Sequence, residues 1–301
     1  MLTNEENQKI ANHFDDAFHH RVCAVLRKYA DIWRLEQVAL IDYFSVNCLF
    51  TCHSKIYGDA VLKVCAPSNQ VATEIEALRE HDDDIFCKML AFSIEDSVIL
   101  EEAIRPGTQL RAVQSTAERI KIFLSLYSAL HIRPDVPEKY PTYSRWVEHI
   151  TSFMSAQKDP PELYQYMREA YDICQSIQQK YNQKMLLHGD FHHDNILLSA
   201  GGKYKVIDPK GVVGDPIFDI PRFILNEFDD DFTYEENYNH IACVINSLSA
   251  GANLPAKDIR RVFFVEMAMA TCWSIESGKT PDMDDVKMAY SMLDLNGEFC
   301  K

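Results

Sequence analysis

Hydrophobic and polar positions along the first hundred residues change from helical to strand-like spacing. Up to about residue 28, apolar residues recur at helical intervals. Five later runs are rich in Val, Ile, Leu, Phe and Tyr and predict strands, over 37–44, 48–57, 60–66, 86–93 and 97–104. YGDA separates the second run from the third and is typical of a hairpin turn. A helix is expected over 70–81, between the third and fourth strands.

Beyond Gly107 the apolar positions take helical spacing. This spacing predicts helices over 116–131, 161–181 and 258–278. Ser115 and Glu118 form a capping box at the start of the first of them. Short strand-like runs interrupt this part of the chain at 184–187, 195–199 and 203–208, the last two joined by a turn at Gly201–Gly202. The sequence therefore predicts an α+β chain whose strand-rich front precedes a helix-rich body, with the boundary near 102–107.

Composition narrows the class of protein. A chain of 301 residues with 47% hydrophobic content can bury the core of one large domain or of two lobes. The most apolar late run, 262–273, is short and is interrupted by Glu266, so neither a signal peptide nor a membrane span is expected, and we expect a cytoplasmic protein. Nine cysteines without a CxxC pair argue against a disulfide framework or a zinc ribbon.

Charge points to the kind of partner. The formal net charge of -15 at pH 7 disfavours nucleic acid and anionic membranes, and no Lys/Arg-rich run offsets it. A small cationic molecule is the partner that such a field would attract. The oligomeric state cannot be read from the sequence.

The run LLHGDFHHDNILLS, 186–199, is the strongest chemical signal, and two kinds of site could use it. His188 and His192 have the i, i+4 spacing of ligands on a zinc helix. Gly189 between them, the missing glutamate of an HExxH helix and the strand-like flanks disfavour that interpretation. The other is a phosphoryl-transfer site, in which one carboxylate orients a hydroxyl nucleophile and a nearby carboxamide holds magnesium.

A phosphoryl-transfer site needs a second acidic metal ligand. The strand-like run KYKVID ends at Asp208, and a hairpin through Gly201 and Gly202 would return Asp208 to the neighbourhood of Asn195. Asp190, Asn195 and Asp208 would then place oxygen-bearing side chains at one end of the hairpin. Such a set suits hard Mg²⁺ better than zinc.

HGDFHHDN, 188–195, followed by VIDPKGVVGDPIFDIPRFILNE, 206–227, resembles the aminoglycoside phosphotransferase superfamily, most closely its streptomycin 6-phosphotransferase and hydroxyurea kinase branch. The similarity extends from about 99 to 278. It implies a protein-kinase-like two-lobed fold, with a small β-rich N-lobe and a larger, mainly helical C-lobe. Residues 1–102 would form the nucleotide-binding lobe, and residues 103–301 the catalytic and substrate-binding lobe.

The resemblance also implies roles for individual residues in the C-lobe. Asp190 would be the catalytic carboxylate, and Asn195 and Asp208 would be Mg²⁺ ligands. His188 would brace the catalytic loop. Lys210 could touch a phosphate or be merely solvated.

In the N-lobe the resemblance implies that Lys63 reaches the ATP phosphates, with Glu74 as its helix partner and Glu76 as a rival for that role. Glu102 and Ala103 would lend backbone groups to the adenine. The phosphate-covering loop should lie in DYFSVNCLF, 42–50, which has no glycine, so Ser45 and Asn47 would have to form its tight turn.

The expected reaction is transfer of the ATP γ-phosphoryl group to a hydroxyl of an aminoglycoside-like acceptor of the streptomycin type, with ATP and Mg²⁺ as cofactors. The acidic run 226–237 could contact such a cationic acceptor through Asp229, Asp230 and Asp231, or be only a solvated loop. Two alternatives stay open. One is a metabolic kinase for a choline-like or sugar-like alcohol, and the other is a non-catalytic nucleotide-binding pseudokinase.

Overall fold

The computed structural model describes residues 2–42, 46–81, 84–157 and 159–295, and the chain forms two compact units. The first unit comprises Met1–Thr108 and Leu197–Ile207, and the second comprises Gln109–Ile196 and Asp208–Lys301. The predicted boundary at 102/103 placed the hairpin that turns at Gly201–Gly202 in the later part of the chain. The structure instead assigns Leu197–Ile207, which contains this turn, to the first unit. The roles assigned to the two predicted lobes stay predictions.

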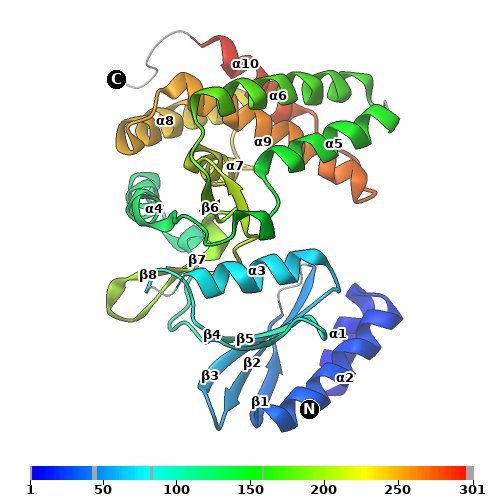
Figure 1. The fold of residues 1–301 in the computed structure, drawn as a ribbon. Coiled ribbons are helices and arrows are strands. Elements are labelled where there is room, and N and C mark those ends of the chain that lie inside the picture. Colours follow the sequence, from blue (N-terminus) through cyan, green and yellow to red (C-terminus); the bar gives the residue numbers. More distant parts are fainter. Residues whose placement is uncertain (1, 43–45, 82–83, 158, 296–301) are drawn as a thin grey trace. The chain divides into compact units, whose positions relative to one another are not determined.

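The first unit is built on a five-stranded antiparallel sheet with strand order β1-β2-β3-β5-β4 (Figure 1). Its strands are β1 Leu35–Leu40, β2 Asn47–Ser54, β3 Gly58–Cys65, β4 Met89–Ser93 and β5 Val98–Glu102. Its helices are α1 Asn4–His13, α2 Asp16–Ile32 and α3 Asn69–Glu80. The strand predicted over 37–44 begins two residues earlier and ends at Leu40, and the last residues of that prediction, 43 and 44, lie outside the described residues.

Alternation along β3 sends its side chains to two different apolar layers. Leu62 and Val64 pack with the buried residues of α1 and α2, whereas Cys65 packs with Val71 and Ile75 of α3. Because side chains of a strand alternate between its faces, residue 63 must point to the same side as Cys65. The sheet is thus sandwiched between the first two helices and α3, and position 63 faces α3.

A two-stranded hairpin completes the first unit. It consists of β7 Ile196–Leu198 and β8 Tyr204–Val206, joined by the turn-like helix η4 Ala200–Gly202. Gly201 has a φ of 73°, which glycine adopts without a steric penalty. Backbone hydrogen bonds from Leu198 to Thr108 and from Val206 to Ile85 attach the hairpin to the rest of this unit.

The second unit is mainly helical. Its α-helices are α4 Thr116–Leu130, α5 Tyr143–Gln157, α6 Pro161–Lys180, α7 Ile220–Leu225, α8 Tyr234–Ala252, α9 Ala256–Glu276 and α10 Asp284–Ser291. A small ladder pairs β6 Met185–Leu187 with β9 Val212–Gly214. Short 3-10 helices are η1 Leu110–Ala112, η2 Pro137–Lys139, η3 His193–Asn195, η5 Pro216–Asp219 and η6 Met292–Asp294. The three helices predicted from apolar spacing correspond to α4, α6 and α9.

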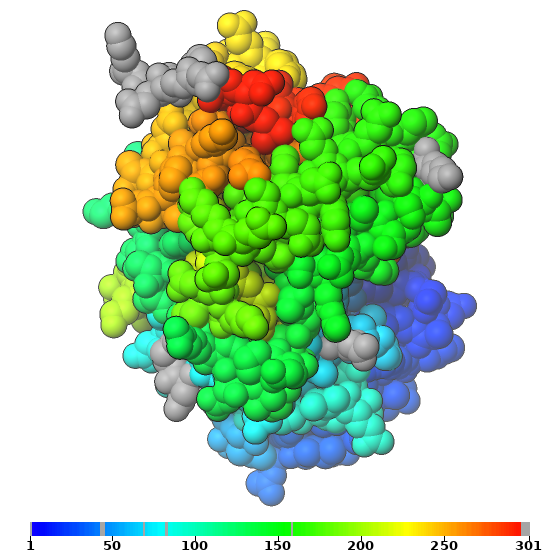
Figure 2. All heavy atoms as spheres, turned by 45° about the horizontal axis from the view of Figure 1, so that its top comes forward, coloured from blue at the N-terminus to red at the C-terminus, as the bar shows by residue number. Residues whose placement is uncertain are grey.

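Helix α9 is the centre of the second unit. It packs against α5, α6, α7, α8 and α10, and most of its residues are buried on every side. Figure 2 shows the red residues of α10 beside the green residues of α6 at the surface, where Tyr290 lies against Tyr166 with ring centroids 4.9 Å apart. In the part of the chain that the structure describes, no helix has the length and apolar character needed to cross a membrane.

Candidate active site

In the first unit, Lys63 and Glu74 form a buried ion pair. The Lys63 Nζ atom lies 2.6 Å from Glu74 Oε1, and the two side chains are 1% and 9% exposed. A buried ammonium is costly unless a carboxylate compensates it, so the pair holds β3 and α3 at a fixed distance. Glu76, the rival partner, instead pairs with Arg79 one turn further along α3, at 2.9 Å.

The other residues predicted to contact the nucleotide lie at or next to the ends of strands, except Ser45, which is not among the described residues. Asn47 begins β2 opposite Cys65, and Ser45 falls outside the described residues. The Glu102 backbone N–H donates to Lys88 O at 2.9 Å, and the Ala103 N–H donates to Asp59 O at 3.1 Å. An adenine contact through these two N–H groups would therefore compete with bonds inside the first unit.

In the second unit, Asp219 holds the turn that leads into the loop 188–195, which contains the predicted catalytic carboxylate. Its side chain is fully buried and accepts hydrogen bonds from the backbone N–H groups of His188, at 2.8 Å, and Gly189, at 2.7 Å, as well as from the His131 ring at 2.9 Å. Gly189 has a φ of 76°, and a Cβ atom there would meet Trp146 at 2.9 Å. The turn therefore requires glycine, and Asp219 acts as its structural brace.

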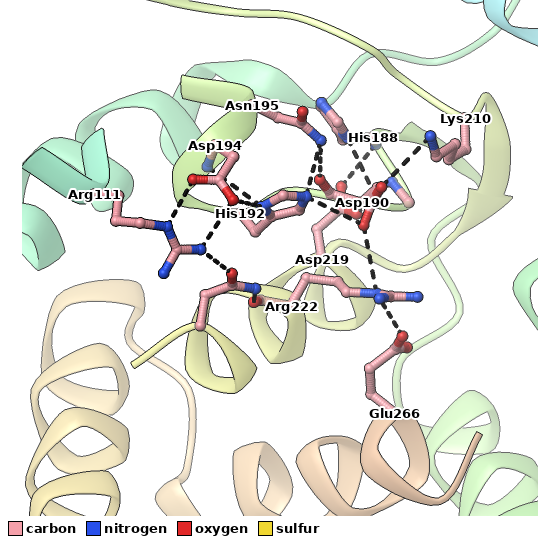
Figure 3. Close-up of polar contacts among 12 residues, drawn as sticks. Arg111, His188, Asp190, His192, Asp194, Asn195, Lys210, Asp219, Arg222 and Glu266 are labelled. Carbon is pink, nitrogen blue, oxygen red and sulfur yellow. Dashed lines mark hydrogen bonds and ion pairs between the residues drawn. The ribbon is translucent and has the colours of Figure 1, made fainter. Parts of the chain in front are cut away.

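Asp190 follows this turn and lies among three groups that can carry positive charge (Figure 3). Its Oδ2 atom is 3.4 Å from Lys210 Nζ, and its Oδ1 atom is 3.6 Å from His192 Nε2 and 3.7 Å from Arg222 Nε. Burial alone would raise the pKa of Asp190, but the His192 ring, Arg222 and Lys210 together hold that pKa far below its ordinary value. The carboxylate therefore stays ionised, and about a fifth of it remains exposed.

Asn195 has one side of its carboxamide already engaged. Its Nδ2 group donates to Asp190 O at 2.9 Å, and the residue is 8% exposed. This bond fixes the orientation of the carboxamide and leaves the oxygen as the end that can bind a hard cation. The predicted role as a Mg²⁺ ligand fits this donor geometry.

Asp208 has a left-handed backbone with a φ of 59°, which is uncommon outside glycine. Two residues later the Lys210 N–H donates to His188 O at 2.7 Å, so the segment after Asp208 is attached to the catalytic turn. A carboxylate on this segment and the oxygen of Asn195 are the ligand types that Mg²⁺ prefers.

The histidines do not form a zinc helix. His188 lies in the turn after β6, and its Nδ1 atom accepts a hydrogen bond from the Asp190 N–H at 3.1 Å. His192 precedes the 3-10 helix η3, and its Nδ1 atom accepts from the Asp194 N–H at 3.3 Å. The two rings are thus engaged within the loop rather than aligned on one helical face.

The acidic run proves to have two parts. Glu227 is buried at 3% exposure and accepts from Arg119, at 2.8 Å and 2.5 Å, from His193 at 2.7 Å and from His240 at 3.4 Å. The sequence alone does not predict this buried cluster, because its members are far apart in the chain. Asp229, Asp230 and Asp231 are exposed.

Arg111 makes a second set of contacts that fixes the loop 188–195. Arg111 binds both oxygens of Asp194, at 2.7 Å and 2.9 Å, and donates to Asn226 at 2.6 Å. The bidentate geometry is the strong form of such a pair.

The second unit also has a cavity of about 500 Å³ at the end of the β6–β9 ladder remote from Asp190. Arg145, Tyr181, Lys184 and Asp215 are among its lining residues. None of the predicted catalytic or metal-binding residues lines it, so the size of this cavity does not locate the chemistry.

Comparison with known proteins assigns the family. The model of the family described as aminoglycoside/hydroxyurea antibiotic resistance kinase matches residues 35–278. Streptomycin 6-kinase of Streptomyces griseus is 25% identical over 164 residues, which make up 54% of this chain and 53% of that protein. The alignment thus spans about half the length of this curated relative.

Solved structures agree on the fold. A choline kinase from Streptococcus pneumoniae superposes with a TM-score of 0.65 at 13% identity, covering 91% of this chain and 97% of the other. A choline/ethanolamine kinase family protein from Mesorhizobium loti superposes with a TM-score of 0.66 at 14% identity, covering 91% of this chain and 95% of the other. A thermostable mutant of aminoglycoside phosphotransferase APH(4)-Ia, in complex with ADP and hygromycin B, superposes with a TM-score of 0.62 at 12% identity, covering 90% of this chain and 97% of the other. The predicted protein-kinase-like α+β fold is confirmed.

Proposed function

The chain belongs to the aminoglycoside/hydroxyurea antibiotic resistance kinases, and from this premise we propose that it transfers the γ-phosphoryl group of ATP to a hydroxyl of a small cationic acceptor of the streptomycin type. The observation that carries the proposal is the environment of Asp190, an ionised carboxylate held beside Lys210 and Arg222 and next to a carboxamide whose oxygen is oriented for a metal. The partial alignment with streptomycin 6-kinase supports the choice of acceptor.

Asp190 orients the acceptor hydroxyl for attack on the γ-phosphorus. The new bond joins the acceptor oxygen to phosphorus while the bond from phosphorus to the β,γ-bridging oxygen breaks, and ADP leaves. The depressed pKa makes Asp190 a weak base, so it takes up the hydroxyl proton late, after most of the phosphorus–oxygen bond has formed, and then releases it to solvent. Positioning rather than strong proton abstraction accounts for its contribution.

Asn195 and Asp208 would hold Mg²⁺, which supplies neutralisation of the phosphate charge when bound. Lys63, fixed by Glu74, would bind the α- and β-phosphates. The nucleotide site would also include Asn47, the backbone of Glu102 and Ala103, and Ser45, which lies outside the described residues.

The test is phosphorylation of an acceptor panel by the purified chain with Mg-ATP. The panel consists of streptomycin, hygromycin B, choline, ethanolamine and a neutral sugar, and mass spectrometry detects the added phosphoryl group. Streptomycin is expected to be the best acceptor, with activity lost in EDTA and in Asp208→Asn. Preferential phosphorylation of choline or ethanolamine would instead support a metabolic kinase. Nucleotide binding without phosphorylation of any acceptor would support the non-catalytic alternative.

A further inference from the structure

Arg222 on α7 forms an ion pair with the buried side chain of Glu266. Its Nε atom lies 2.7 Å from Glu266 Oε1, and Glu266, 2% exposed, also accepts a hydrogen bond from Tyr143 Oη at 2.5 Å. The Arg222–Glu266 contact is an ion pair without hydrogen-bond alignment. The guanidinium lies over the ring of Trp273, with its central carbon 5.3 Å from the centroid. An arginine held by an acid and an aromatic face has little freedom to move away from Asp190.

The terminal nitrogens of Arg222 are left over by these contacts. In both of its ion pairs, to Asp190 and to Glu266, the contacting atom is Nε, and Figure 3 shows the guanidinium continuing beyond the nitrogen at which the two dashed lines meet. Among the described residues, no side chain or carbonyl accepts a hydrogen bond from these terminal nitrogens. The Arg222 side chain is 23% exposed and the Asp190 side chain is 20% exposed, so part of each group is accessible to solvent.

Two tryptophans border the same place. Trp146 on α5 lies against Gly189, the residue before Asp190, and Trp273 on α9 lies under Arg222. Their ring centroids are 6.3 Å apart with the planes at 71°, and both residues are partly exposed. Partly exposed tryptophans beside a catalytic carboxylate provide apolar surface for the ring of an acceptor.

We propose that Arg222 is an acceptor-binding, specificity-determining residue, whose terminal N–H groups donate to an uncharged or anionic oxygen of the acceptor next to the hydroxyl that Asp190 orients, while Trp146 and Trp273 border the acceptor ring. This inference rests on the proposed function and deepens it. A guanidinium at this position repels a cation placed directly beside the reacting hydroxyl. The acceptor class is therefore a hydroxyl-rich ring whose reacting hydroxyl has an oxygen neighbour on the Arg222 side, with its ammonium or guanidinium groups directed elsewhere.

The test compares acceptor and ATP kinetics in Arg222→Met. Removing Arg222 alone strands the buried Glu266, so the substitution is made together with Glu266→Gln, which keeps an oxygen for Tyr143 to donate to. With streptomycin as the probe, KM for the acceptor in the double variant is expected to rise on the order of 10- to 100-fold, the size of a lost hydrogen bond from a charged donor, relative to Glu266→Gln alone. KM for ATP should stay within about twofold, because Arg222 has no role at the nucleotide in this proposal.

Acceptor analogues give a second readout. Deoxy analogues of streptomycin, each lacking one oxygen adjacent to the phosphorylated hydroxyl, are assayed with both enzymes. One of these analogues should bind Glu266→Gln more weakly than streptomycin does. Adding Arg222→Met should not weaken the binding of that analogue further. Arg222→Lys should recover part of the acceptor affinity, and Arg168→Met, at an exposed arginine of α6, should change neither KM.

Each outcome separates the inference from the function on which it rests. An unchanged acceptor KM in the double variant, or an equal rise of both KM values, overturns the role of Arg222 while the kinase assignment stands. If the unaltered chain phosphorylates no member of the panel, the proposed function fails, and the inference fails with it. A melting temperature matching that of Glu266→Gln establishes that a changed KM does not come from unfolding.

Discussion

Asp190 combines two properties that usually oppose each other. It is largely buried, which favours the neutral acid, yet Lys210 and Arg222 approach its two oxygens and keep it ionised. Glu266 lies 2.7 Å from Arg222 Nε and balances its charge, whereas Asp190 lies 3.7 Å from the same atom. Arg222 therefore stabilises the ionised form of Asp190 without forming a close ion pair with it. The carboxylate is thus available to an acceptor hydroxyl while its own proton affinity is low.

We predict that Asp190→Asn lowers kcat by about 10²–10⁴-fold, the typical contribution of a positioned acid or base. The amide keeps the shape of the side chain but loses the negative charge that orients the acceptor hydroxyl and takes up its proton late in the reaction. Mg-ATP binding, measured by calorimetry, should be nearly unchanged, because the proposed metal ligands Asn195 and Asp208 remain. A variant with near-normal turnover would exclude Asp190 as the catalytic carboxylate.

Among single residues, the sequence predicted Asp190 and Asn195 as parts of one site because they are close together in the chain, and their catalytic and metal-binding roles stay predictions. It could not decide between Glu74 and Glu76, since both lie on one helix and the choice depends on which faces position 63. The alternation of β3 directs Lys63 towards α3, where it pairs with Glu74, whereas Glu76 pairs with Arg79. Arg222 lay inside the recognised motif, but its importance depends on Glu266 and Trp273, which belong to a helix much later in the sequence.

Among the elements, the short helix α7 and its flanks do most to position the loop 188–195. Asp219 precedes the helix and accepts from the turn at His188 and Gly189. Asn226 and Glu227 follow it, and they reach Arg111 and His193 beside the loop. A helix of this length cannot persist alone. Its place is fixed by these polar contacts at both ends and by its packing against α9.

We predict that Glu227→Gln destabilises the protein by about 3 kcal/mol, because it removes one partner of a buried charged cluster and leaves Arg119 uncompensated. Thermal denaturation should show a melting temperature lower by several degrees. The matched control is Asp230→Asn, which removes an exposed carboxylate from the same run and should leave the transition in place. Equal effects of the two substitutions would contradict the structural role of Glu227.

Stability should also fall as the pH is lowered from 7 to 5. Burial lowers the pKa of His193 against the opposing effect of Glu227, so the folded state favours the neutral ring, whose Nδ1 atom has no hydrogen-bond partner among the described residues. Since the unfolded ring has a pKa near 6.5, the unfolded state binds more protons below that pH, and stability is lost by at most about 1.4 kcal/mol per pH unit.

Melting curves between pH 7 and pH 5 test this dependence. His193→Gln keeps a group that can donate to Glu227 but does not titrate, so its melting temperature should change less over this range. The lowered pKa of Glu227 adds a loss of stability only below about pH 4.5, where the unfolded carboxylate takes up its proton. If the melting temperature of His193→Gln falls with pH as steeply as that of the unaltered protein, groups other than His193 cause the effect.

The elements that the sequence predicted well are those with long or strongly periodic apolar patterns, such as α4, α6 and α9. Strand β9, Val212–Gly214, was not predicted, because a three-residue run is too short to establish a period. Its partner β6 gives it a place in the ladder. Helix α5, which carries Trp146, was also not predicted, and with it one border of the proposed acceptor site went unrecognised.

For the molecule as a whole, the formal net charge of -15 is the property that a distant ligand meets first. A field of this sign raises the local concentration of cations and speeds their encounter with the protein, and salt screens it over about 8 Å at physiological ionic strength. Parts of the acidic run are already committed, since Glu227 is buried and Glu236 forms the capping box of α8. Asp229, Asp230 and Asp231 remain exposed and can contribute to attraction.

We predict that replacing Asp229, Asp230 and Asp231 together by Asn raises KM for streptomycin several-fold at low salt, with little change in kcat, because exposed charges act mainly on binding. The difference from the unaltered protein should shrink as salt is raised to about 0.5 M, where screening shortens the reach of these charges. The control carries the same charge change at three scattered exposed positions, Asp31→Asn, Asp172→Asn and Asp294→Asn. If both triple variants raise KM equally, the net charge alone attracts the acceptor. If neither does, the acidic run is a solvated loop with no part in acceptor binding.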